Sequence, residues 1–158
     1  MGTLVTNSDG LQVHYGTRDV DYNFARAVGG VDSVQKIVFD IKATDLATTV
    51  TINGASAFIP ADSLIKSATL LVQEGFTSGG SATLTIGTYS IAGAAVDADG
   101  IDAAVAVAGL GANVDIACDG SQVGTIVTAD CYIGAIYGTA AFTAGTARLV
   151  IEYIQNRG

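Results

Sequence analysis

Residues 68–86 read ATLLVQEGFTSGGSATLTI, which is two alternating segments around a run of small residues. Apolar side chains occupy every second position of both segments, namely Ala68, Leu70, Val72, Ala82, Leu84 and Ile86. A period of two with threonine at the intervening positions is typical of half-buried antiparallel strands. The glycines and serines of residues 74–81 predict a hairpin turn between the two strands.

The same pattern continues on both sides of this stretch. Alternation recurs at residues 37–42 and 49–52, and further β-type segments lie at 122–128, 132–137 and 147–154. Turn residues separate these segments at intervals of about 8–12 residues, a spacing typical of sandwiches and jelly rolls. We therefore predict an all-β fold, an antiparallel β-sandwich that is jelly-roll-like with about eight strands, formed by residues 34–158 as a single domain.

Two places depart from simple alternation. After Ile86, the pair Gly87–Thr88 changes the parity of the apolar residues, which predicts a glycine bulge that turns the strand between sheets. Residues 97–109, DADGIDAAVAVAG, begin with acidic residues, continue through alanines and end at glycine. This order predicts one short helix, with Asp99 at its N-cap and Asp102 near its third position.

Residues 1–33 have a different character from the rest of the chain. They lack sustained periodicity and end near Gly29–Gly30, so they predict an extended N-terminal arm with a flexible joint. The arm contains aromatic side chains, which suggests that it packs on its own domain or on a neighbouring subunit. The candidate interface residues are His14, Tyr15, Arg18, Tyr22, Phe24 and Arg26.

Composition restricts the class of protein. The 158 residues are 49% hydrophobic and 14% charged, which suits one packed domain and excludes an intrinsically disordered chain. The net charge is −8, and the seven basic residues are scattered along the sequence, so we expect no nucleic-acid partner. The uncharged run at residues 131–147 contains three glycines and is too short for a spanning helix, so we expect no membrane segment.

Few residues could carry chemistry. Asp97, Asp99 and Asp102 resemble part of a Ca²⁺ loop, but no glutamate completes the ligand set, so a turn with a helix cap explains them better. His14 is the only histidine, so zinc has no ligand set, and it lies in the predicted arm rather than on a rigid scaffold. We therefore expect no enzymatic activity, no cofactor and no metal.

The two cysteines allow two readings. Cys118 and Cys131 are thirteen residues apart and could form a disulfide. Because cysteine is among the most buried side chains, two buried free thiols are the favoured expectation.

Four segments together resemble a known class of protein. They are FIPADSLIKSATLLVQEGF at 58–76, ATLTIGTY at 82–89, AVDADGIDAA at 95–104 and GTAAFTAGTARLVIEY at 138–153. These segments look like small structural proteins of tailed bacteriophages. The resemblance covers residues 34–154 and rests on strand and turn motifs.

The resemblance implies a capsid decoration, or cement, protein. Such a protein is made in the host cytoplasm, binds the major capsid protein on the outer surface of the virion and is commonly a trimer. An acidic chain suits that surface, because inside the shell it would be repelled by the packaged DNA. The alternatives are another virion component of the neck, tail or fibre, and, with less support, a carbohydrate-binding module.

Overall fold

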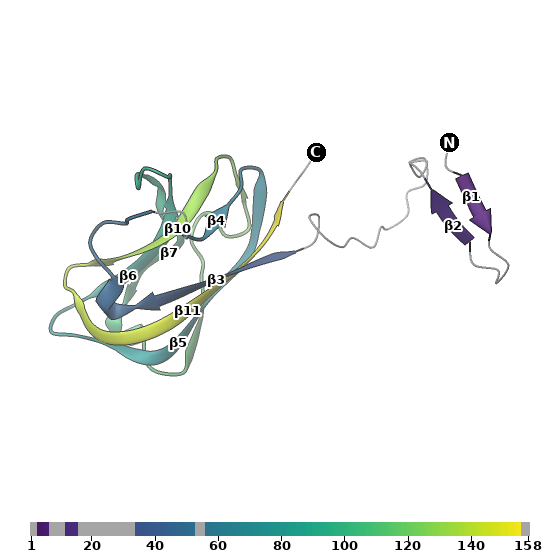
Figure 1. Ribbon diagram of the computed structural model, residues 1–158. Helices are drawn as coiled ribbons and strands as arrows, with labels where there is room; N and C mark the ends of the chain where they lie inside the picture. Colours follow the sequence, from purple (N-terminus) through teal and green to yellow (C-terminus); the bar gives the residue numbers. More distant parts are fainter. Residues whose placement is uncertain (1–2, 7–11, 16–33, 53–55, 156–158) are drawn as a thin grey trace.

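The computed structural model describes residues 3–6, 12–15, 34–52 and 56–155. From residue 35 onward, two antiparallel sheets pack face to face (Figure 1). We call them the β11 sheet and the β10 sheet after their central strands. The β11 sheet has the order β3 (Gln35–Lys42), β11 (Phe142–Gln155), β5 (Ser63–Ser78) and β8 (Val114–Ala117), with β9 (Ile126–Val127) also paired to β5. The β10 sheet has the order β4 (Phe58–Ile59), β10 (Cys131–Gly138), β6 (Thr83–Tyr89) and β7 (Ala95–Ala106).

The pairing of these strands is nested along the chain. With short β9 left aside, the first strand of the sandwich pairs with the last, β3 with β11, and the second with the last but one, β4 with β10. The inner pairs are β5 with β8 and β6 with β7. This rolled-up order over eight strands in two sheets is the jelly roll. The predicted all-β sandwich is confirmed.

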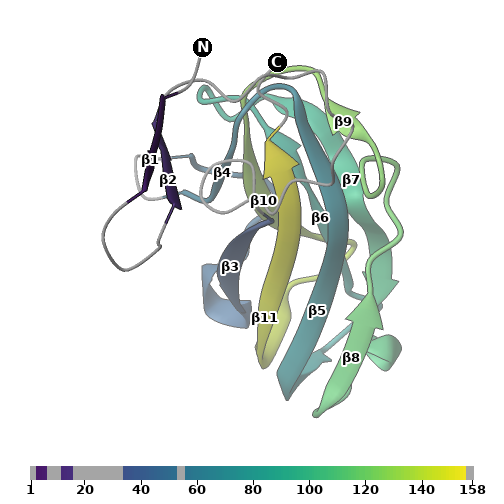
Figure 2. The same ribbon diagram turned by 90° about the vertical axis from the view of Figure 1, so that its right-hand side faces the viewer.

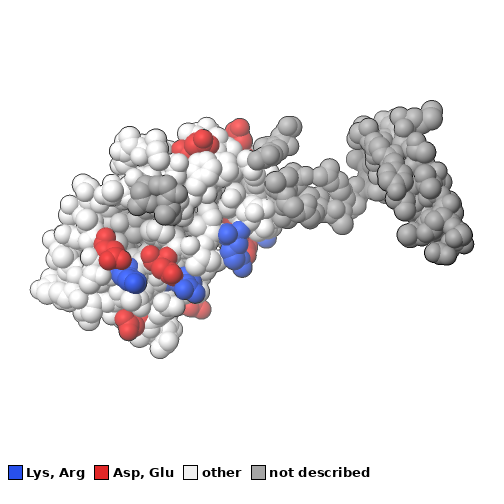
Figure 3. Space-filling model, viewed as in Figure 1, with Lys and Arg blue, Asp and Glu red and all other residues white. Residues whose placement is uncertain are grey.

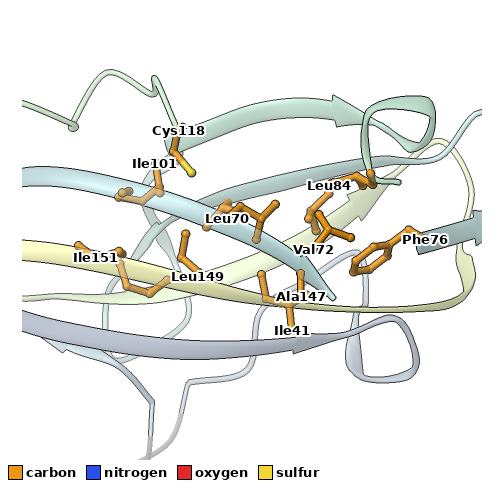
Figure 4. Packing of buried hydrophobic residues seen from close by; sticks show 14 of the residues in the cluster. Ile41, Leu70, Val72, Phe76, Leu84, Ile101, Cys118, Ala147, Leu149 and Ile151 are labelled. Atoms are coloured by element: carbon orange, nitrogen blue, oxygen red, sulfur yellow. The ribbon is translucent and has the colours of Figure 1, made fainter. Parts of the chain in front are cut away.

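The core lies between the two sheets and follows from the alternation in the sequence. Along β11, Ala147, Leu149 and Ile151 face inward and are buried. Leu70 and Val72 of β5 meet them from the neighbouring strand, and Leu84 of β6 faces them from the other sheet (Figure 4). At one end of the core, the rings of Phe76 and Phe142 pack edge to face with centroids 5.1 Å apart.

The predicted hairpin at residues 74–81 is wrong. Strand β5 continues to Ser78, and residues 79–82 lead to β6, which belongs to the other sheet. The glycines mark a turn, but turn chemistry does not tell which sheet the next strand joins. That choice depends on β11, which pairs with β5 along twelve register positions and lies far away in sequence.

The predicted glycine bulge is also misplaced. Strand β6 stays in one sheet and pairs with β10 without a register shift from Thr83 to Tyr89. The irregularity lies in β7. Thr88 pairs with Asp97 and Ile86 pairs with Asp102, so β7 advances by five residues where β6 advances by two. Gly87 permits this arrangement, because a Cβ atom there would lie 2.2 Å from the carbonyl oxygen of Ala98.

The predicted helix at residues 97–109 is wrong as well. Residues 97–106 belong to β7, and only Val107–Gly109 form a single 3₁₀ turn, η2. Asp99 is therefore not a helix cap, and Asp102 is a buried strand residue. Alanine has the highest helix propensity, but propensity is a weak preference, and pairing with β6 outweighs it here.

Part of the predicted N-terminal arm is a short hairpin. Strands β1 (Thr3–Thr6) and β2 (Gln12–Tyr15) are antiparallel and, among the described strands, pair only with each other. The remainder of residues 1–33 lies outside the described residues. Within the described part of the chain, no helix is long and apolar enough to cross a membrane.

Candidate functional site

The three aspartates of β7 do not form a cation site. Asp97 Oδ2 accepts a hydrogen bond of 2.5 Å from Ser121 Oγ, and this bond lowers the pKa of Asp97. Asp102 is buried and lies opposite Ile86, a core residue of β6. Over the described ranges, no three acidic, histidine or cysteine side chains are grouped so that they could hold a metal ion.

Asp102 and Cys118 form a buried polar contact inside the sandwich. Burial raises the pKa of Asp102, and a hydrogen bond from the Cys118 thiol opposes that effect. Asp102 Oδ2 has no hydrogen-bond partner in the described part of the chain. Burial, together with the neighbouring carboxylate, raises the pKa of Cys118 to about 12. A thiol of this kind is protonated at neutral pH, whereas reactive cysteines have a lowered pKa.

The second cysteine is similar. Cys131 is buried in β10, and burial raises the pKa of its thiol to about 11. Cys118 and Cys131 are both free, which confirms the prediction of two buried thiols.

The outer face of the β11 sheet carries paired charges. Arg148 Nε donates to Asp40 Oδ1 at 2.7 Å, and Lys36 Nζ lies 3.6 Å from Glu152 Oε1. The hydrogen bond from Arg148 lowers the pKa of Asp40. Figure 3 shows basic and acidic side chains next to each other on this face.

All basic residues of the described ranges lie on this sheet, although they are scattered in sequence: Lys36, Lys42, Lys66 and Arg148. Two of the four are paired with carboxylates, and the sheet also carries Glu74 and Asp115. The face is therefore a charge-balanced, solvated surface rather than a basic patch.

Exposed apolar side chains gather at one end of the sandwich. Figure 2 shows that β4, β9 and the C-terminal end of β11 lie toward this end, which is uppermost in that view, whereas β8 lies toward the other. We call it the apolar end and define it by five exposed residues, Val34, Phe58, Ile91, Val96 and Ile126. Three half-buried side chains, Leu64, Tyr132 and Ile154, lie beside them.

On the β11 sheet, the residues of the apolar end form a row across four neighbouring segments. Ile154 of β11 pairs with Leu64 of β5, which pairs with Ile126 of β9. Gln35 pairs with Tyr153, so Val34 lies next to Ile154 at the edge of the row. Val127 faces the core, so Ile126 before it points outward.

On the β10 sheet, the apolar end begins with an aromatic pair. Phe58 of β4 pairs with Tyr132 of β10, and their ring centroids are 5.2 Å apart. Ile59 is fully buried, so Phe58 points to the outer side. The turn from β6 to β7 is closed by the Gly93 amide, which donates to the Ser90 carbonyl oxygen, and it presents Ile91 there.

The opposite end of the sandwich has a different surface. Its turns, residues 79–82, 107–113 and 139–141, consist mainly of glycine, alanine, serine, threonine and asparagine. Val114, at the start of β8, is the exposed large hydrophobic residue at this end of the described structure.

The structure bears only in part on the predicted interface residues. His14 and Tyr15 lie in β2, and their side chains are outside what is described. Arg18, Tyr22, Phe24 and Arg26 lie outside the described residues. Sequence reasoning missed the apolar end, because each of its residues is an isolated apolar position and only the jelly-roll topology brings them together.

The chain matches no protein-family model and no curated protein sequence. Solved structures do share its fold. A chain of the capsid of Ralstonia phage GP4 has a TM-score of 0.50 and is 18% identical, and the alignment covers 86% of this chain and 93% of that one. This jelly roll is a fold found in phage capsids. A chain of the cyanophage Pam1 capsid asymmetric unit has a TM-score of 0.55 and 15% identity, with coverage of 89% and 98%.

Proposed function

We propose that this protein is a capsid decoration, or cement, protein of a tailed bacteriophage. The observation that carries the proposal is the likeness to two phage capsid chains over nearly the whole of each chain. Because both alignments take in almost all of both partners, the two capsid chains have about the same length as this one. A single jelly roll of this size suits a small accessory component of a shell.

The physical properties of the chain support a place on the outer surface. Packaged DNA would repel a chain with a net charge of −8, and a place on the outside of the capsid avoids that close contact. There the protein would bind the major capsid protein, as a trimer at a junction of subunits. Binding to the closed shell stabilises it by mass action, so the role requires neither catalysis nor a cofactor.

The N-terminal arm is part of the proposed mechanism. Tyr15, Tyr22 and Phe24 are the aromatic anchors expected to lie across neighbouring capsid subunits, since buried aromatic residues dominate binding energy at interfaces. His14, Arg18 and Arg26 complete this contact with polar and basic groups.

The test is to add the purified protein to expanded capsids that lack it and to measure occupancy and the temperature at which the shells open. Saturable binding and a higher opening temperature are expected. A protein without residues 1–28 should bind with lower occupancy, and unchanged occupancy would remove the arm from the mechanism. Absence of binding by the full chain would contradict the proposed function.

Copy number separates this function from the alternative of a neck, tail or fibre component. Quantitative mass spectrometry of purified virions should find this chain in hundreds of copies per particle, in proportion to the major capsid protein. A handful of copies would instead indicate a tail or neck component.

A further inference from the structure

We infer that the apolar end of the sandwich is the part of this protein that contacts the capsid, inserted end-on between capsid subunits. The inference rests on the proposed function and adds the surface and the orientation of binding. The opposite end, with turns 79–82, 107–113 and 139–141, then faces the solvent.

Most of the exposed large apolar side chains are gathered at the apolar end. Seven large hydrophobic residues of the described ranges are exposed, and five of them form the apolar end. These five side chains are between 39% and 63% exposed. Single exposed apolar residues are ordinary on a soluble protein, but their collection at one end marks a contact surface.

The apolar end carries exposed apolar residues on both outer sides of the sandwich. Val34 and Ile126 lie on the outer side of the β11 sheet, whereas Phe58 lies on the outer side of the β10 sheet. A flat partner could cover one of these sides only. Apolar residues on both sides of one end fit a partner surface that surrounds it, as a junction between subunits does.

The N-terminal arm joins the sandwich at the apolar end. The described sandwich starts at Val34, within the apolar end, so residues 1–33 are attached there. The 18 residues between the β1–β2 hairpin and the sandwich span at most about 60 Å when fully extended, which is enough for the hairpin to reach a neighbouring subunit. If the arm lies on the capsid, the end of the sandwich that carries the arm must therefore face the capsid.

The charges favour a capsid subunit over a second copy of this chain as the occupant. Three segments form the tip of this end, residues 58–62, 89–97 and 126–132, and their charged residues are all acidic: Asp62, Asp97 and Asp130. Two copies meeting through these three segments would bring their carboxylates together, because the segments contain no basic residue. The fitting partner is an apolar protein surface with basic groups at its rim.

The test compares two variants on capsids that lack this protein. The double substitution Ile91→Ser with Ile126→Ser changes both sides of the apolar end, and its residues are exposed, so folding should be preserved. The matched control is Val38→Ser with Val114→Ser, which are also exposed but lie midway along the edge strand β3 and at the opposite end of the sandwich. Thermal melting of the free proteins verifies that both are folded.

We expect the apolar-end variant to bind at least about tenfold more weakly than the parent protein, and the control within about twofold. If the parent protein binds and the apolar-end variant binds equally well, the inference is wrong while the proposed function stands. If the parent protein does not bind, both fail. The variant could instead lose self-association in solution, with capsid binding falling only in proportion to that loss. The apolar end would then be a contact between copies of this chain, and the inference would be overturned.

A tag gives a second readout that does not depend on affinity. A peptide epitope inserted between Gly79 and Gly80 should remain accessible to antibody on decorated capsids, since no atoms surround a Cβ placed at Gly79. The same epitope inserted after Ala92, in the turn of the apolar end, should prevent decoration. Two results would contradict the proposed orientation. One is that the protein with the epitope after Ala92 still decorates capsids, and the other is that the epitope between Gly79 and Gly80 is inaccessible to antibody on decorated capsids.

Discussion

Asp102 is the residue at which sequence and environment disagree most. The residue is 5% exposed, and its carboxyl group faces the Cys118 thiol and leaves Oδ2 without a partner among the described atoms. Burial raises its pKa in the folded protein above the unfolded value of about 3.9. The folded state therefore holds this proton more tightly than the unfolded state does. The resulting stabilisation is full below the unfolded pKa and is lost as the pH rises through the folded pKa.

Replacement of this carboxyl group should stabilise the protein in a pH-dependent way. At pH 7, Asp102→Asn should raise the free energy of unfolding by about 1–3 kcal/mol, because it removes a buried charge with an unpaired oxygen. At about pH 3.5, where the aspartic acid of the parent is protonated, the gain should largely disappear. Urea denaturation at the two pH values measures the difference.

The exposed Asp115→Asn is the control and should change stability little at either pH. A loss of stability in Asp102→Asn at pH 7 would mean that the ionised form of Asp102 is held by a favourable contact.

Strand β7 depends on a glycine in the neighbouring strand. Its irregular segment, residues 97–102, approaches β6 where Gly87 lies. A Cβ atom at Gly87 would lie 2.2 Å from one backbone atom of Ala98 and 2.3 Å from another. Backbone atoms cannot move aside as a flexible side chain can, so the strands would have to separate.

Gly87→Ala should therefore lower the free energy of unfolding by about 2–4 kcal/mol, as overpacking against a fixed neighbour does. Gly79→Ala is the matched control, since its Cβ would meet nothing within 4 Å, and it should change stability by about 0.5 kcal/mol or less. Urea denaturation of the two variants gives the comparison. Equal effects would show that β7 moves away from β6 without cost.

The elements also show how far local patterns reach. Alternation identifies β3, β5 and β6, because a period of two directly reports that one face of a strand is buried. The alanine-rich segment 97–106 misleads, because its strand character comes from pairing with β6 rather than from its own residues. The same limit explains the predicted hairpin, where a turn was recognised but its partner sheet was not.

At the scale of the whole molecule, net charge competes with local ion pairs. The chain carries a net charge of −8, while the pairs Arg148–Asp40 and Lys36–Glu152 lie on an exposed face. Exposed ion pairs contribute about 0–1 kcal/mol each and weaken with salt. Repulsion among the excess carboxylates is also screened by salt, and it acts over the whole surface.

We therefore expect sodium chloride, raised from low concentration to about 1 M at pH 7, to increase the melting temperature by a few degrees. Thermal unfolding followed by circular dichroism measures this. The variant Lys36→Gln with Arg148→Gln, which loses both pairs and two positive charges, should show a steeper increase with salt. A melting temperature that falls with salt in the parent would mean that the ion pairs outweigh the repulsion.

The candidate surface belongs to the same scale. Five residues form this surface, Val34, Phe58, Ile91, Val96 and Ile126, and none of them stands out in the sequence, because single exposed apolar residues are ordinary on a soluble protein. They become one surface because strands from distant parts of the chain end together in the jelly roll.

The sequence by itself determined that this protein is an acidic, all-β sandwich, since composition and a period of two report burial along the chain. The tertiary structure alone decided which strands share a sheet, that residues 97–106 are a strand, and that exposed apolar residues meet at one end. These features depend on contacts between segments that are far apart in sequence, and such contacts leave no local pattern.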